Sequence, residues 1–118
     1  MTVSAGMEAG VDREVLLDRV GGDEELLREI TKIFLDEYPA LVEDIKAAVK
    51  DGDAIQLEHA AHSLKGSVSN FGAREATEAA FELECMGRNG KLTSAQFAVA
   101  TLEYQFQLLR PQLFHLIS

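Results

Sequence analysis

The chain has 118 residues, of which 47% are hydrophobic and 26% charged, so it can form one globular domain without disulfides or metal ions. Its formal net charge of −9 argues against nucleic acid or an anionic membrane surface as a partner, because both would repel it. With one cysteine, no signal peptide and no apolar run near the roughly 20 residues that span a bilayer, we expect a cytoplasmic protein.

The N-terminal part predicts a flexible segment and then a short helix. Residues 1–10 are small and polar, and we expect them to be flexible and to precede a single domain over residues 11–118. Asp12 can cap a short helix, which Gly21 and Gly22 end.

A long helix is predicted next. Asp23 is its N-cap, Gly52 is its stop signal, and Pro39 is expected to kink or restart it. Its apolar residues follow helical spacing and are Leu26, Leu27, Ile30, Ile33, Phe34, Tyr38, Leu41, Ile45, Ala48 and Val49.

Two further helices follow in the middle of the chain. Asp53, with Gln56 at the capping-box position, begins a helix that ends at Gly72. The next helix covers about residues 73–88. Its inward residues are expected to be Ala76, Ala79, Ala80, Leu83 and Met86.

The last helix begins after Thr93, which forms a capping box with Gln96, and Pro111 is expected to bend it. No segment alternates with period two for long enough to form a strand. Four long helices joined by short glycine-containing turns predict an all-α fold, an antiparallel four-helix bundle preceded by a short N-terminal helix.

The helix that begins after Asp53 is amphipathic, and His62 lies on its polar side. On a wheel of about 100° per residue, the residues near His62 are Lys65, Gly66, Ser69, Glu58 and His59. The residues near the opposite pole are Leu57, Ala60, Leu64, Val68 and Phe71. We therefore expect His62 to be exposed to solvent at mid-helix.

This face suits phosphoryl transfer. Near neutral pH an exposed imidazole is largely uncharged, and one ring nitrogen keeps a lone pair that can attack phosphorus. Lys65, one turn away, supplies a cation for the phosphoryl oxygens. Gly66 costs the helix about 1 kcal/mol relative to alanine, which fits a surface that a partner must approach closely. From the residues alone, an ordinary exposed helix face without chemical function is an equally open interpretation.

Other kinds of site find little support in the sequence. No glycine-rich phosphate loop and no Gly-x-Gly-x-x-Gly motif is present, so we expect no nucleotide site. Cys85 lacks a histidine nearby in sequence. His59 and His62 share a spacing that occurs in metal sites, but both point outward, so we expect no bound metal. His115 has the default role of a surface or capping residue.

The chain resembles a histidine-containing phosphotransfer (HPt) domain of multistep two-component phosphorelays, over roughly residues 11–115. The segments that carry the resemblance are Ala61-His62-Ser63-Leu64-Lys65-Gly66-Ser67, Asn70-Phe71-Gly72-Ala73, Val20-Gly21-Gly22-Asp23-Glu24-Glu25-Leu26-Leu27, Phe34-Leu35, Pro39 and Leu83-Glu84. The His-x-Leu-Lys-Gly block with Gly72 is the specific part. Ala76 departs from the family, which often has a larger aliphatic residue there.

The resemblance implies a four-helix bundle and a role for each residue of the motif. His62 would accept a phosphoryl group from an aspartyl-phosphate on one receiver domain and pass it to another. Lys65 would steady the phosphoryl oxygens, and Gly66 would leave room for the receiver domain, with Ser69 and Asn70 in support at most. The residues expected to contact a docking partner are Gly66, Ser69, His59, Glu58 and Ile55.

The resemblance also implies the partners and cofactors. The chain would be a phosphoryl carrier without its own ATP site, and it would not be an enzyme. Its partners would be response-regulator receiver domains, a hybrid sensor histidine kinase, or both, and the Mg²⁺ would sit on the receiver domain. The family usually works as a monomer, and the Met1 start favours a free-standing protein.

Two alternatives stay open. The chain could be an adaptor bundle that binds a receiver or kinase domain without accepting phosphate. It could also resemble the phosphoacceptor domain of a chemotaxis-type kinase, which an ATP-binding domain in another chain phosphorylates.

Overall fold

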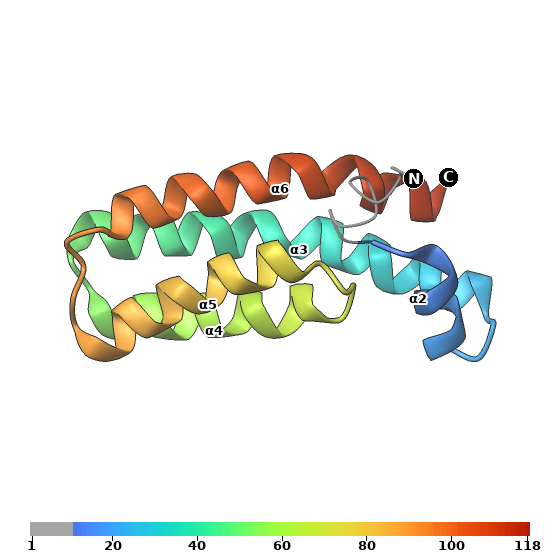
Figure 1. Cartoon of the computed structure of the whole chain (residues 1–118), viewed down its shortest axis with the longest axis horizontal. Coiled ribbons are helices and arrows are strands. Elements are labelled where there is room, and N and C mark those ends of the chain that lie inside the picture. Colours follow the sequence, from blue (N-terminus) through green and yellow to red (C-terminus); the bar gives the residue numbers. More distant parts are fainter. Residues whose placement is uncertain (1–10) are drawn as a thin grey trace, which may run out of the picture.

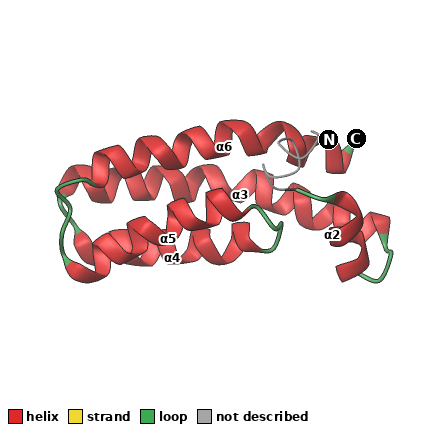
Figure 2. Cartoon of the chain, viewed as in Figure 1, coloured by secondary structure: helices red, strands yellow, loops and turns green. Residues whose placement is uncertain are grey.

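The structure, a computed structural model, describes residues 11–118, and the predicted flexible segment 1–10 lies outside them. In residues 11–118 it consists of helices joined by short turns, with no strand (Figures 1 and 2). The helices are α2 (Arg13–Arg19), α3 (Glu24–Asp51), α4 (Ala54–Ser69), α5 (Arg74–Asn89) and α6 (Ala95–Ile117). The predicted all-α fold is confirmed.

The four long helices form an antiparallel bundle, and α2 lies across one end of it (Figure 1). Helix α4 packs against α3 and α5, and helix α6 also packs against α3 and α5. Helices α4 and α6 therefore occupy opposite corners of the bundle. None of the helices in residues 11–118 has the length and apolarity to cross a membrane.

The predicted aspartate caps are confirmed. The side chain of Asp12 accepts from the backbone N–H of Glu14 at 3.0 Å, and Asp23 accepts from Leu26 at 3.0 Å. Asp53 accepts from the N–H of Gln56 at 3.1 Å, which fixes the start of α4. Each cap satisfies an N–H group that has no partner within its helix.

Two predictions about helix boundaries are wrong, the restart at Pro39 and the capping box of the last helix. Helix α3 is a single helix through Pro39, and buried residues on both sides, Tyr38 and Val42, hold it in the core. A kink at Pro39 stays a prediction. Helix α6 begins at Ala95 instead of directly after Thr93, and no side chain caps its first turn. The fully buried Ala95 packs the first turn into the core in place of the predicted capping box.

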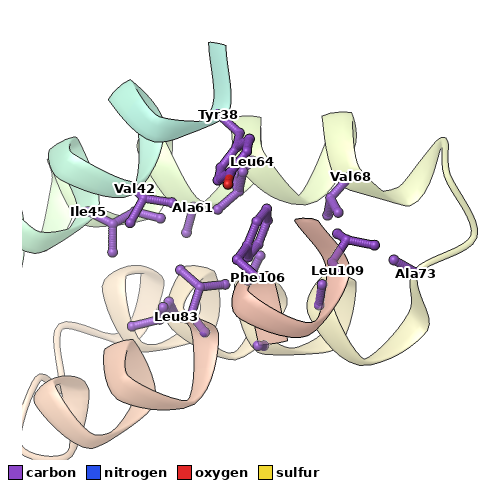
Figure 3. Packing of buried hydrophobic residues seen from close by; sticks show 14 of the residues in the cluster. Tyr38, Val42, Ile45, Ala61, Leu64, Val68, Ala73, Leu83, Phe106 and Leu109 are labelled. Atoms are coloured by element: carbon purple, nitrogen blue, oxygen red, sulfur yellow. The ribbon is translucent and has the colours of Figure 1, made fainter. Parts of the chain in front are cut away.

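The core lies between the four long helices and is made mostly of aliphatic and aromatic side chains (Figure 3). Phe34 is at its centre, with ring centroids 5.3 Å from Tyr38, 5.0 Å from Phe71 and 6.3 Å from Phe106. Such aromatic contacts contribute about 0.5–1.5 kcal/mol each beyond area burial. This cluster ties α3 and α6 to the end of α4.

The predicted apolar stripe of α3 is wider than the buried one. Leu26, Ile30 and Ile33 are 41%, 36% and 53% exposed, although their spacing is helical. Leu27, Phe34 and Ile45 lie about 100° further round the helix and fill the core instead. The flank of α3 next to α2 therefore carries exposed aliphatic side chains.

Candidate functional site

His62 lies in the middle of α4 with 66% of its side chain exposed. Leu57, Leu64 and Val68, on the opposite side of the same helix, are 0% exposed. The predicted exposure of His62 is confirmed, and it follows from the amphipathic pattern of α4.

The imidazole of His62 contacts a buried carboxylate on α5. Oε2 of Glu84 lies 3.1 Å from Nδ1 of His62, and the Glu84 side chain is only 3% exposed. The other oxygen, Oε1, lies 2.8 Å from Nζ of Lys65. Arg88, one turn further along α5, donates to Oε2 of the same carboxylate at 2.5 Å. One carboxylate thus connects three side chains from two helices.

The pKa of the Glu84 carboxyl is lowered. Burial alone would raise this pKa, but the hydrogen bonds from Lys65 and His62 and the charge of Lys65 outweigh the burial. The carboxylate is therefore ionised at neutral pH and can only accept hydrogen bonds. The Nδ1 atom of a neutral His62 must carry the proton, which leaves the lone pair on Nε2.

A second carboxylate completes the cluster. Nε of Arg88 donates to Oε2 of Glu58 on α4 at 3.2 Å, and this hydrogen bond is the main reason that the pKa of Arg88 is raised. Glu58 and Glu84 together balance Lys65 and Arg88. With His62 neutral, the cluster has no net charge, although the whole chain carries −9.

Gly87 lets α4 and α5 approach closely at this point. A Cβ atom added to Gly87 would lie 2.6 Å from the backbone N of Glu58 and 2.7 Å from the backbone O of Ala54. Contacts this short do not occur between real atoms, so only glycine fits. Because Gly87 is three residues after Glu84, the close approach brings the carboxylate of α5 within reach of His62.

The structure brings some of the predicted docking residues together and spreads others along α4. Glu58, His59 and His62 line a shallow open hollow with Ser63, Glu84 and Arg88. Further along α4, nothing lies within 4 Å of a Cβ added to Gly66, which is exposed. Ser69 donates its hydroxyl back to the carbonyl of Gly66 at 2.9 Å. Ile55, two turns before His62, is 70% exposed.

Lys65 differs from its predicted environment. The sequence placed Lys65 on the exposed side of the helix beside His62, but its side chain is only 27% exposed and is paired with Glu84. Its Nζ also lies 4.9 Å from the centroid of the Phe81 ring. The charge of Lys65 is thus held in a fixed position by α5.

The sequence reasoning missed Glu84 and Arg88 as site residues. A signal for Glu84 was present, since it lies four residues after Ala80 and three before Gly87, on the buried side of α5. A charged residue in a buried position needs partners, and these mark a possible site. Arg88 gave no comparable signal beyond its i+4 spacing from Glu84. Within residues 11–118, no group of three or more His, Cys, Asp or Glu residues is placed to hold a metal ion.

Comparisons with known proteins agree with this geometry. A family model described as the Hpt domain matches residues 29–112 of the chain. The chain is also similar to the crystal structure of histidine-containing phosphotransfer protein B (HptB) from Pseudomonas aeruginosa PAO1. The sequence identity is 29% and the TM-score 0.82, over 90% of this chain and 92% of that one. No curated protein matches the chain.

Proposed function

The chain belongs to the Hpt domain family and has a histidine phosphotransfer role in a phosphorelay, and from this premise we propose that His62 carries the phosphoryl group. The observation that supports this residue is its contact with Glu84. An ionised carboxylate at Nδ1 leaves the lone pair of Nε2 available on an exposed helix face.

The transfer step follows from this tautomer. The lone pair of Nε2 attacks the phosphorus of an aspartyl-phosphate, a P–N bond forms, and the P–O bond electrons return to the aspartate carboxylate. No proton has to move, and the imidazole ring gains positive charge. Glu84, 3.1 Å from Nδ1, stabilises that charge as it develops. The reverse step uses the same atoms in the opposite order.

The neutral cluster around His62 suits an anionic group. A phosphoryl group brings a charge of about −1.5 to −2, which an acidic surface would repel. Lys65 and Arg88 already balance the nearby carboxylates, so the group does not meet uncompensated negative charge here. In this proposal Lys65 supplies the positive field for the phosphoryl oxygens.

The partners of an Hpt domain are receiver or kinase domains of a two-component relay. We propose response-regulator receiver domains, a hybrid sensor histidine kinase, or both, in the cytoplasm. The chain acts as a carrier without its own ATP site, and the Mg²⁺ belongs to the receiver domain. The proposed docking surface is the outer side of α4, and its residues are Gly66, Ser69, His59, Glu58 and Ile55.

The test is phosphoryl transfer from a panel of phosphorylated receiver domains, with acid-labile label on the chain as the readout. We expect label on the natural chain and none on His62→Gln. Retained label on His62→Gln would contradict the assignment.

His59→Gln is the matched control, because His59 lies on the same face one turn earlier and contacts the same hollow. Because His59 belongs to the proposed docking surface, this variant is expected to accept label more slowly but to the same final extent, and complete loss of label would implicate His59 instead. An adaptor would take no label from any receiver domain. A phosphoacceptor domain of a chemotaxis-type kinase would take label only from ATP and a separate ATP-binding kinase domain.

A further inference from the structure

Helix α6 differs from the other long helices in the character of its exposed surface. Among its exposed residues, Arg110 is the one with a formal charge. The others are Gln96, Phe97, Ala100, Tyr104, Gln107, Leu108, Pro111, Phe114 and His115. Glu103 is partly exposed and pairs with Lys46, but it lies, like Arg110, on a different side of the helix from Phe97 and Tyr104. A side of a helix without charge is unusual in a chain with a net charge of −9.

Three of the four large apolar side chains that α6 exposes form one stripe, and the fourth, Phe114, lies about 100° round the helix, beside Arg110. Phe97, Tyr104 and Leu108 are 78%, 57% and 43% exposed, and their spacing places them on the same side of the helix. The same side continues through Pro111 to His115, over about 27 Å at 1.5 Å per residue. We call this surface the α6 stripe: Phe97, Thr101, Tyr104, Leu108, Pro111 and His115.

The α6 stripe points away from the bundle and from the His62 site. The buried residues of α6, such as Leu102, Leu109 and Leu113, lie about 140° round the helix from it. Helix α4 occupies the opposite corner of the bundle and contacts the same two neighbours as α6 (Figure 1). A partner on the stripe would leave His62 open.

We propose that the α6 stripe is the contact surface of a homodimer, in which two copies of α6 pack antiparallel. Two chains of net charge −9 repel each other, so they can associate best through a surface without charge. Antiparallel packing also matches side chains of different size. It sets Phe97 against His115 of the partner subunit, and Tyr104 against Leu108 of the partner subunit.

The size of the surface indicates a weak dimer. An aromatic side chain buries about 150–250 Å² in full, so the exposed parts of Phe97 and Tyr104 in both copies supply on the order of 500 Å². The rest of the stripe adds to this, but the total stays near the lower end of the 1,200–2,000 Å² typical of stable interfaces. The dimer is therefore expected at high protein concentration, which differs from the monomer that the family resemblance implied.

The first test is sedimentation of the full chain over a range of about 1 μM to 1 mM, because weak dimers dissociate in the micromolar range and above. We expect a dimer whose dissociation constant falls as salt screens the repulsion between the chains. Tyr104→Glu is expected to raise this constant at least tenfold. Ile33→Glu, on an equally exposed apolar position of α3, is the matched control and is expected to change it less than twofold.

Three results would overturn the proposal: a monomer at every concentration, a dimer that Tyr104→Glu does not weaken, or a dimer that higher salt dissociates. Circular dichroism of both variants shows that each remains folded. A contact with a different protein on this surface would give a monomer here.

The second test is disulfide cross-linking in a Cys85→Ser background, which removes the one native thiol. Chains with Thr101→Cys are mixed with chains with Pro111→Cys. Antiparallel packing is expected to cross-link the two kinds with each other, because positions 101 and 111 face each other across the dimer. Cross-linking of Thr101→Cys chains mainly among themselves would indicate parallel packing and contradict the proposed arrangement.

Discussion

The outer sides of α4 and α6 lie at opposite corners of one bundle, and they differ in chemistry. At the outer side of α4, Glu84 and Arg88 from α5 and Lys65 from α4 hold charges at fixed distances around the exposed imidazole of His62. On the α6 stripe, Phe97 and Tyr104 are exposed, and none of its residues is Asp, Glu, Lys or Arg. Phosphoryl transfer needs fixed charges beside the reacting atom, whereas two chains of the same net charge associate best through a surface that carries no charge. The four-helix bundle keeps the two surfaces apart.

The largest expected effect is on the rate of phosphoryl transfer, when a glutamate is placed on each of the two surfaces in turn. Gly66→Glu adds bulk and negative charge one turn from His62 and is expected to lower the rate of phosphoryl transfer at least 100-fold, about 2.7 kcal/mol. Tyr104→Glu adds the same charge on the far side and is expected to change that rate less than twofold. Transfer from one phosphorylated receiver domain measures both. Equal rates for the two variants would remove the distinction between the surfaces.

The next largest effect is on the stability of the fold, when the close contact between α4 and α5 at Gly87 is disturbed. Gly87→Ala forces a methyl group against the backbone of Glu58 and Ala54, so it is expected to destabilise the fold by about 1–3 kcal/mol. Urea denaturation measures this change. Ala100→Gly is a control for simple helix propensity on an exposed position of α6, with an expected loss of about 1 kcal/mol. No destabilisation in Gly87→Ala would show that α4 and α5 can separate at this point.

The charge of Glu84 predicts a pH-dependent difference in stability. Because its pKa is lowered on folding, the carboxylate stabilises the fold above its ordinary value of 4.5, and this stabilisation is lost as the pH falls through the lower folded value. Glu84→Gln is therefore expected to cost about 1–3 kcal/mol at pH 7, and the difference from the natural chain is expected to shrink towards pH 3.

Urea denaturation at the two pH values measures this shrinkage. Glu82→Gln, an exposed neighbour on α5, is the control and is expected to change stability by less than about 0.5 kcal/mol at both. A Glu84→Gln variant with the same deficit at pH 3 and pH 7 would mean that the charge of Glu84 is not what stabilises the cluster.

The smallest expected effect is a gain in the stability of the fold. Gly66 lies in α4 with open space around its Cβ position, so Gly66→Ala is expected to stabilise the fold by up to about 1 kcal/mol. A higher melting temperature combined with slower transfer would show that this glycine serves docking rather than folding. A destabilised Gly66→Ala would contradict the open surroundings of this residue.

The sequence was sufficient for those parts of the molecule that depend on neighbouring residues. The caps at Asp12, Asp23 and Asp53 and the exposure of His62 follow from local spacing, and the structure confirms them. Glu84 depends on another helix. A glutamate on a helix is exposed by default, and its partners His62 and Lys65 on α4, together with Arg88 on α5, explain why this one is buried.

The width of a buried surface also depends on neighbouring helices. Leu26, Ile30 and Ile33 fit the apolar spacing of α3, but the short helix α2 does not cover them. Pro39 gives the opposite lesson, because packing of Tyr38 and Val42 keeps a helix continuous where the local rule predicts a break. Contacts between elements decided both cases.

The hydrogen bond between His62 and Glu84 has a consequence for how a signal passes through this protein. In the proposed mechanism Nδ1 carries its proton whether Nε2 is bare or phosphorylated, so the ring keeps one orientation in both states. In this mechanism the phosphorylated and unphosphorylated proteins differ by one P–N bond and share one orientation of the His62 ring. The direction of transfer between two receiver domains is then set by how far each of them is phosphorylated.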